Sequence, residues 1–166
     1  MDWHHYALYL SKLKTLKNKQ MKNLFITTVL ALSIAVSSIA ADVSNVNYNA
    51  ERNFFAEFGR AKNVNWTAKE NYSKASFTLN QVAMEAFYDY QGNFIGTSRK
   101  IDIGDLPING KRSVAKKYAA YTVKEVIKFE GAEETAYYLV AENEKQSLFL
   151  KVSVEGFVSV FKKVTK

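Results

Sequence analysis

Two successive patterns in this chain constrain its fold most strongly: a short helical spacing, and then an alternation of apolar and polar residues. In the first half Ala50, Phe54 and Phe58 recur at helical spacing, and from Asn63 onward the period changes to two. The alternating segments are short and are separated by turn residues, as in antiparallel strands joined by hairpins. This half therefore predicts one helix and four antiparallel strands, the last of which ends near Ile101.

The second half follows the same order. Asp105-Leu106-Pro107 predicts the start of a helix, because aspartate is a good cap and proline suits the first turn. Strands are expected at residues 122–130, 137–142, 146–154 and 157–164. We expect a bulge in the first of these strands, since its apolar residues break strict alternation.

An alignment of Gly92 with Gly156 makes the apolar positions before the two hairpins coincide, which indicates an internal repeat of about 60 residues. The two repeats span about 46–101 and about 105–164. Such units predict a single α+β domain over residues 41–166, in which each unit supplies one helix and four strands. The strands would form one antiparallel sheet with both helices on one face.

The segment before this domain has the pattern of a sorting signal. Met21 begins a short positive stretch, residues 24–39 carry no charge, and Ser38 and Ala40 place small residues where a signal peptidase reads them. The sequence therefore predicts a signal peptide over residues 21–40.

Cleavage is expected after Ala40 or Ala41, which leaves a mature chain of residues 41–166 without a membrane span. A retained anchor is the alternative, but a spanning helix needs roughly 20 apolar residues and this stretch is shorter and contains polar ones. Residues 1–20 are interpreted as a non-native upstream extension, with the native start at Met21.

The mature chain would contain neither histidine nor cysteine, because His4 and His5 lie in the removed segment and the chain has no cysteine. Catalytic sites of the Ser-His-Asp and Cys-His types are thereby excluded, and zinc loses its best ligands. We expect no metal and no cofactor. Residues 41–166 hold 18 lysines and arginines against 15 acidic residues, without the dense basic stripe of a nucleic-acid-binding protein.

The aromatic residues carry the most information about function. Six of them fall at core spacing: Phe54, Phe58, Trp66, Phe77, Tyr88 and Tyr90. Others fall out of phase and are expected on the opposite face of the sheet, where exposed aromatics can anchor a protein partner. The candidate binding residues are Phe87, Asp89, Tyr138, Phe149 and Lys151. The alternative is that these aromatics pack under a loop or against each other, or close a dimer.

Several segments in a fixed order resemble a known family. They are Val64-Asn65-Trp66, AFYDYQGNF at residues 86–94, Asp105-Leu106-Pro107 and YTVKEV at residues 121–126. The chain is similar over residues 46–164 to the beta-lactamase-inhibitor-like, PepSY-like family of small exported proteins from Gram-negative bacteria. The resemblance implies tandem PepSY-like units that form a sheet backed by helices, and a protein that binds other proteins rather than catalysing a reaction.

We therefore expect an exported, periplasmic or secreted binding module that is not an enzyme. Its open sheet face would bind an unidentified protein of the cell envelope or medium, in the manner of an inhibitor, and it would bind no nucleic acid. One alternative is a structural protein that self-associates through an edge strand. The other is a small enzyme that uses only carboxylates, with candidates at Glu133, Glu134, Glu142 and Glu144, although charges at turns are ordinarily solvated.

Overall fold

The computed structural model describes residues 46–166. The expected upstream extension, signal peptide and cleavage site lie outside these residues. The described chain is α+β: two α-helices, a short 3₁₀ helix and eight strands, which form one sheet in the order β1-β2-β3-β4-β5-β6-β7-β8. Every pair of neighbouring strands is antiparallel. No helix within residues 46–166 is long and apolar enough to cross a membrane.

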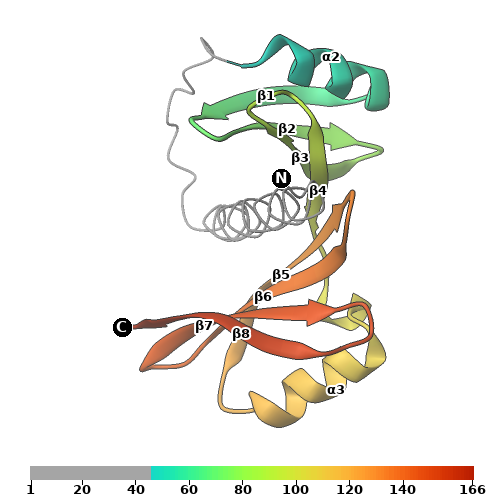
Figure 1. Ribbon diagram of the computed structural model, residues 1–166. Coiled ribbons are helices and arrows are strands. Elements are labelled where there is room, and N and C mark those ends of the chain that lie inside the picture. Colours follow the sequence, from blue (N-terminus) through green and yellow to red (C-terminus); the bar gives the residue numbers. More distant parts are fainter. Residues whose placement is uncertain (1–45) are drawn as a thin grey trace, which may run out of the picture. The chain divides into compact units, whose positions relative to one another are not determined.

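The N-terminal half consists of one helix and the first four strands (Figure 1). Its elements are α2 (Tyr48–Glu57), β1 (Lys62–Lys69), β2 (Tyr72–Leu79), β3 (Val82–Asp89) and β4 (Phe94–Lys100). Asn47 caps α2, because its side-chain oxygen accepts a hydrogen bond from the backbone N–H of Asn49 at 2.8 Å. The helix and strands predicted from the periodicity of this half are confirmed.

An aromatic core joins α2 to its sheet. Phe54 is fully buried, and its ring lies edge to face with Trp66 and Phe77 at centroid distances of 5.4 and 5.0 Å. Tyr90 is the exception among the predicted core aromatics, because it is 52% exposed. It lies beyond the end of β3, in the turn that leads to β4, where alternation no longer determines which side a residue faces.

The C-terminal half has the same order of elements, with a 3₁₀ turn before its helix (Figure 1). They are η3 (Ile103–Asp105), α3 (Ile108–Lys117), β5 (Thr122–Gly131), β6 (Thr135–Glu142), β7 (Gln146–Ser153) and β8 (Val158–Thr165). The bulge expected in β5 is confirmed, because the pairing with β6 shifts between Val123 and Glu125. Asp105 does not cap α3 as predicted: its carboxylate accepts a hydrogen bond from the N–H of Asp102 within the 3₁₀ turn, and Pro107 stands at the N-cap of α3.

Gly110 allows α3 to pack closely on the sheet. Both Gly110 and the facing Val152 on β7 are buried, and a Cβ added at Gly110 would lie 2.5 Å from Cγ1 of Val152. A glycine that weakens an isolated helix is therefore required here by the contact between helix and strand.

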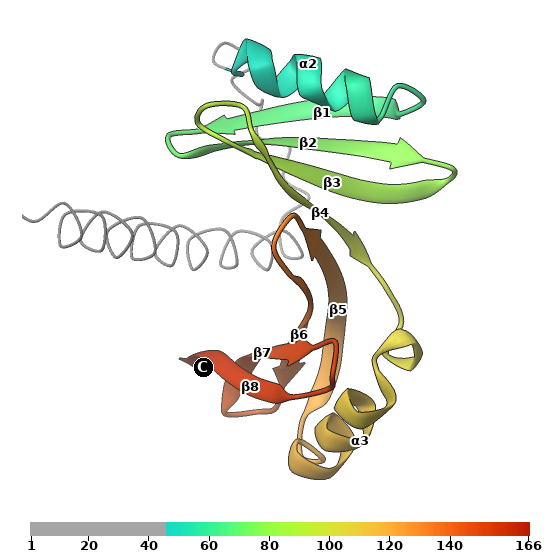
Figure 2. The ribbon, with the colours of Figure 1, turned by 45° about the vertical axis from the view of Figure 1, so that its right-hand side comes forward.

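Both helices lie on the same face of the sheet. Ala86 belongs to the core under α2, and it pairs with Thr97, which pairs with Glu130. Val126 stands four residues before Glu130 on β5, so its side chain points to the same face, where it belongs to the core with Val114 of α3. Figures 1 and 2 show α2 along the strands of the first half and α3 along those of the second. Among the described residues, the opposite side carries no helix, and we call it the helix-free face.

The two hairpins meet their helices in the same way. Gly92 in the β3–β4 turn has φ +87°, and a Cβ there would lie 2.6 Å from the backbone nitrogen of Ala50 in the first turn of α2. Gly156 in the β7–β8 turn has φ +91°, and its Cβ would lie 2.5 Å from the nitrogen of Gly110 in α3. Glycine is needed at both turns for its positive φ and for this close approach.

Candidate binding face

Residues directly opposite each other on paired strands share a face, so the strand register determines which side chains line the helix-free face. All five predicted binding residues belong to this face by register. The structure separates them into two groups. Phe87 and Asp89 lie on β3, whereas Tyr138, Phe149 and Lys151 lie together on β6 and β7.

Phe87 is buried rather than exposed. Only 1% of its surface is accessible, and its ring contacts those of Tyr72 and Phe129 at centroid distances of 6.5 and 6.4 Å. Tyr72 lies on the neighbouring strand β2. Phe129 reaches Phe87 from β5 across Gly96 of β4, where a Cβ would collide with the Phe129 ring. The alternative that the aromatics pack against each other therefore describes Phe87 correctly. The prediction of an exposed Phe87 is wrong, because alternation along β3 identifies a face but not the residues that share it.

Asp89 organises the β3–β4 turn. Its Oδ1 accepts hydrogen bonds from the backbone N–H groups of Gln91 and Asn93 at 2.8 and 2.9 Å, and its Oδ2 accepts one from Nδ2 of Asn93 at 2.9 Å. Such contacts are typical of aspartate at the start of a turn. The carboxylate is therefore already engaged within the protein and is a poor candidate for an anchor to a partner.

Tyr138 is also buried, with 1% of its surface accessible. The ring of Phe161 lies edge to face with it at 5.8 Å, and the Lys151 ammonium lies 5.9 Å from its centroid. Burial raises the pKa of the Tyr138 hydroxyl, and the nearby Glu134 carboxylate adds to the increase. Like Phe87, Tyr138 is not the exposed aromatic that the sequence predicts, because β8 brings Phe161 over it.

Phe149 and Lys151 are both partly exposed, as a binding role requires. Phe149 lies 6.1 Å from Phe161, and the Lys162 ammonium lies 5.4 Å from the Phe149 ring centroid. Lys151 donates to both carboxylate oxygens of Glu134 at 3.0 and 2.9 Å. One compact group on β6, β7 and β8, which we call the aromatic–lysine cluster, therefore comprises Tyr138, Phe149, Lys151, Phe161 and Lys162.

Sequence reasoning missed Phe161 and Lys162. The reason is a bulge: the pairing of β7 with β8 shifts between Phe149 and Leu150, which adds Phe161 to the helix-free face. The signal was present in the sequence, because the apolar residues Val158 and Val160 alternate and Phe161 then breaks the pattern.

The part of the helix-free face that belongs to the N-terminal half carries a buried ion pair beside the Phe87 and Tyr72 rings. Lys74 is buried, and its ammonium donates to Oε1 of Glu85 at 2.8 Å. Oε2 of Glu85 accepts a hydrogen bond from the hydroxyl of Ser98 at 3.1 Å. These groups satisfy one another, whereas the aromatic–lysine cluster combines partly exposed rings with the exposed Lys162 ammonium.

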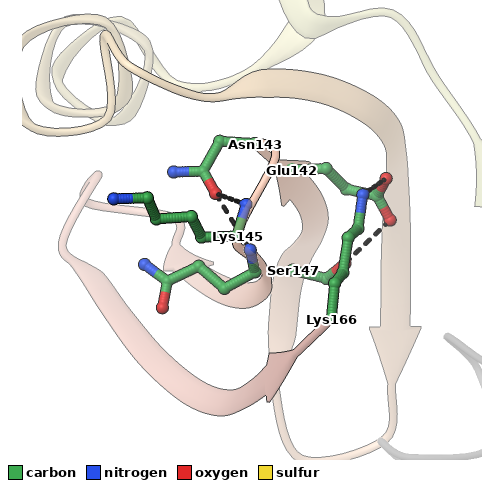
Figure 3. A network of polar contacts seen from close by, with 6 residues as sticks. Glu142, Asn143, Lys145, Ser147 and Lys166 are labelled. Carbon is green, nitrogen blue, oxygen red and sulfur yellow. Dashed lines mark hydrogen bonds and ion pairs between the residues drawn. The ribbon is translucent and has the colours of Figure 1, made fainter.

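The carboxylates proposed for a carboxylate-only enzyme are held by cations or lie exposed on turns. Glu134 binds Lys151, while Glu142 accepts hydrogen bonds from Ser147 at 2.9 Å and from Lys166 at 3.1 Å (Figure 3). These bonds, led by that from Lys166, lower the pKa of Glu142 and keep it ionised. A general acid needs the opposite shift. Within residues 46–166, no three His, Cys, Asp or Glu residues are grouped closely enough to hold a metal ion.

No protein-family model and no curated protein match this chain. Solved structures match it with a TM-score of 0.64. One is a BLIP-like protein from Bacteroides fragilis, with 20% identity over 74% of this chain and 89% of that chain. Another is a DUF2874 family protein from Bacteroides ovatus, with 16% identity over 73% and 88%. A third is a candidate periplasmic protein from Bacteroides eggerthii, with 10% identity over 73% and 89%. The resemblance to beta-lactamase-inhibitor-like proteins is thereby confirmed at the level of the fold, which this chain shares with the BLIP-like and DUF2874 proteins of Bacteroides.

Proposed function

We propose that this protein is an exported, non-catalytic module that binds another protein through the aromatic–lysine cluster of its helix-free face. The observation that carries the proposal is the composition of this cluster. The half-buried rings of Phe149 and Phe161 lie beside each other, with the Lys162 ammonium over the Phe149 ring. The Lys151 ammonium lies over the neighbouring buried ring of Tyr138. Aromatic anchors among polar groups are the usual centre of a protein–protein interface.

The compartment that fits this function best is the periplasm. The predicted signal peptide would direct the chain out of the cytoplasm, and one protein that shares the fold is described as a candidate periplasmic protein. A chain without cysteine does not depend on disulfides for stability, so its two buried cores must supply it.

The domain is best understood as two PepSY-like units in tandem. Each half has one helix and four strands, and Gly92 and Gly156 fit against the first turns of α2 and α3 with nearly equal distances. The BLIP-like likeness supports an inhibitor-like role, in which the partner is an enzyme that the face restrains.

Self-association through β8 is the second candidate function, because β8 ends the sheet and exposes Val160 and Val164. Lys162 and Lys163 on the same strand would repel those of a second copy, and the bulge at Phe161 disturbs the regular edge. A molar mass that rises with protein concentration in sedimentation experiments would support this alternative.

Capture of the partner tests the main proposal. The protein, tagged at its C-terminus and purified from its natural host after cross-linking, serves as bait beside a Phe149→Ala/Phe161→Ala variant. Phe55→Ala is the matched control, because Phe55 lies on α2 and is 56% exposed. The account predicts one protein captured by the wild type and the control and lost with the double variant. A partner that the double variant retains, with thermal melting showing that it is folded, would refute a role for this face.

A further inference from the structure

Besides the basic helix α3, the C-terminal half gathers positive charge around the β6–β7 turn and the end of β8. Five lysines surround this end of the sheet: Lys124, Lys145, Lys162, Lys163 and Lys166. Two of them are joined through the backbone, because the N–H of Lys166 donates to the carbonyl oxygen of Lys145 at 3.0 Å. Two acidic residues lie among them, Glu142 at the end of β6 and Glu144 in the β6–β7 turn.

Most of these cations form no ion pair within the described residues, although the Lys124 charge contributes to the lowered pKa of Glu142. Glu142 is already bound by Lys166 and Ser147, as Figure 3 shows. Among residues 46–166, the structure gives no ion pair to the other four lysines of this end. The ammonium of Lys162 contacts the face of the Phe149 ring, and this contact leaves its N–H donors available.

Apolar surface lies beside these cations. Phe149 and Phe161 are half-buried, and Val164 is 40% exposed. Val164 pairs with Ser147, two residues before Phe149, so it shares the helix-free face with both rings. This end of the face therefore offers alternating apolar and cationic contacts rather than a purely basic surface.

We propose that the lysine-rich end of the helix-free face binds an acidic protein segment in which carboxylates alternate with apolar side chains. This inference rests on the proposed protein-binding function and adds the chemistry of the partner. A carboxylate would accept hydrogen bonds from Lys162 while the apolar neighbours of that carboxylate pack on Phe149, Phe161 and Val164. The nearby ring lowers the hydration of the ammonium, which strengthens its attraction to an anion. The remaining lysines steer the acidic segment toward this end.

The interleaved apolar surface favours a protein segment over a polyphosphate. A nucleic acid is held by a row of cations that neutralises about 6–10 phosphates, and its backbone offers no apolar side chains for the two rings. An anionic lipid headgroup could also bind the lysines, and binding to lipid vesicles distinguishes this case from binding of an acidic peptide.

Amide-resolved NMR titration of the protein with synthetic peptides tests the proposal. The probe is a 12-residue peptide of alternating Glu and Leu, and the comparison peptide carries Gln in place of every Glu. We expect the acidic peptide to shift the amide signals of Phe149, Phe161 and Lys162 and to bind less tightly as salt is raised. Lys162→Gln should weaken binding about fivefold. Lys163→Gln should weaken it less, because Lys163 pairs with Leu148 of the core and its side chain therefore points to the opposite face. Lys116→Gln, at the exposed C-terminal end of α3, should leave the affinity unchanged.

Equal binding of the Gln and Glu peptides at this face would refute the inference that the partner segment is acidic. The proposal that this face binds a protein would still stand. Absence of any shift in these signals with the acidic peptide would overturn the inference as well, and the capture experiment would then decide the proposed function separately. Binding to vesicles that contain anionic lipid, lost in Lys162→Gln and without binding of the acidic peptide, would assign the site to a lipid headgroup instead.

Discussion

Gly110→Ala offers a sharp test of how α3 packs on the sheet. Alanine in place of glycine within a helix ordinarily stabilises a protein by about 1 kcal/mol. Here the new methyl group would lie 2.5 Å from Cγ1 of Val152, roughly 0.9 Å short of ordinary contact at 3.4 Å. Val152 is fully buried and β-branched, so its χ1 angle is restricted and a rotamer change relieves the contact poorly. Overpacking of this kind costs about 1–3 kcal/mol, which offsets or exceeds that gain, and we expect a net loss of about 0–2 kcal/mol.

Urea unfolding followed by circular dichroism measures this loss. The matched variant is Val152→Ala, which alone should destabilise the protein by about 2–3 kcal/mol through the cavity that it leaves. The double variant should be more stable than the sum of the two changes by about 1 kcal/mol or more, because the methyl group added at position 110 enters the space vacated by Val152. An increase in stability on Gly110→Ala alone, or strict additivity in the double variant, would refute the packing described for α3.

Three further predictions concern polar groups. Asp89→Ala removes three hydrogen bonds of the β3–β4 turn and should lower the free energy of unfolding by about 1–2 kcal/mol in urea titration, whereas no change would show that the turn does not depend on them. Glu85→Leu leaves the buried Lys74 ammonium without its carboxylate and should lower the free energy of unfolding by about 2–3 kcal/mol in the same assay. Adding Lys74→Met should restore part of this stability, and an unaffected single variant would contradict the pairing. The lowered pKa of Glu142 means that its stabilising contribution is present above the ordinary value of 4.5 and is lost as the pH falls through the lower folded-state pKa. Melting temperature measured against pH should therefore fall less steeply on the acid side in Glu142→Gln, and an identical profile would rule out this contribution.

The secondary structure follows closely from local patterns, because short hairpin-linked strands and capped helices leave signals within a few residues. The helix after Asn47 and the bulge in β5 are visible in the sequence for this reason. The predictions are wrong where alternation ends, or where a residue could belong to either of two adjacent elements. Tyr90 lies past the end of its strand, and Asp105 belongs to a 3₁₀ turn that the pattern does not distinguish from the start of α3.

The candidate site was harder to predict because exposure depends on residues distant in sequence. Alternation assigned Phe87 and Tyr138 to the helix-free face, but their burial involves Phe129 and Phe161, which are brought beside them by strand pairing. A bulge in β8 moves Phe161 to this face, and only the register with β7 shows where it lies. The likeness to an exported binding family came from the order of motifs, which is independent of that register.

Site-specific photo-cross-linking in the periplasm of the natural host tests the central claim most directly. A photoreactive benzophenone amino acid replaces Val164 on the helix-free face in one variant and Phe55 on α2 in the other, both of which are exposed positions. The account predicts a discrete cross-linked protein from position 164 and none of the same mass from position 55. A cross-link from position 55 alone, or none from position 164 in a folded and exported variant, would contradict the assignment of the helix-free face as the binding surface.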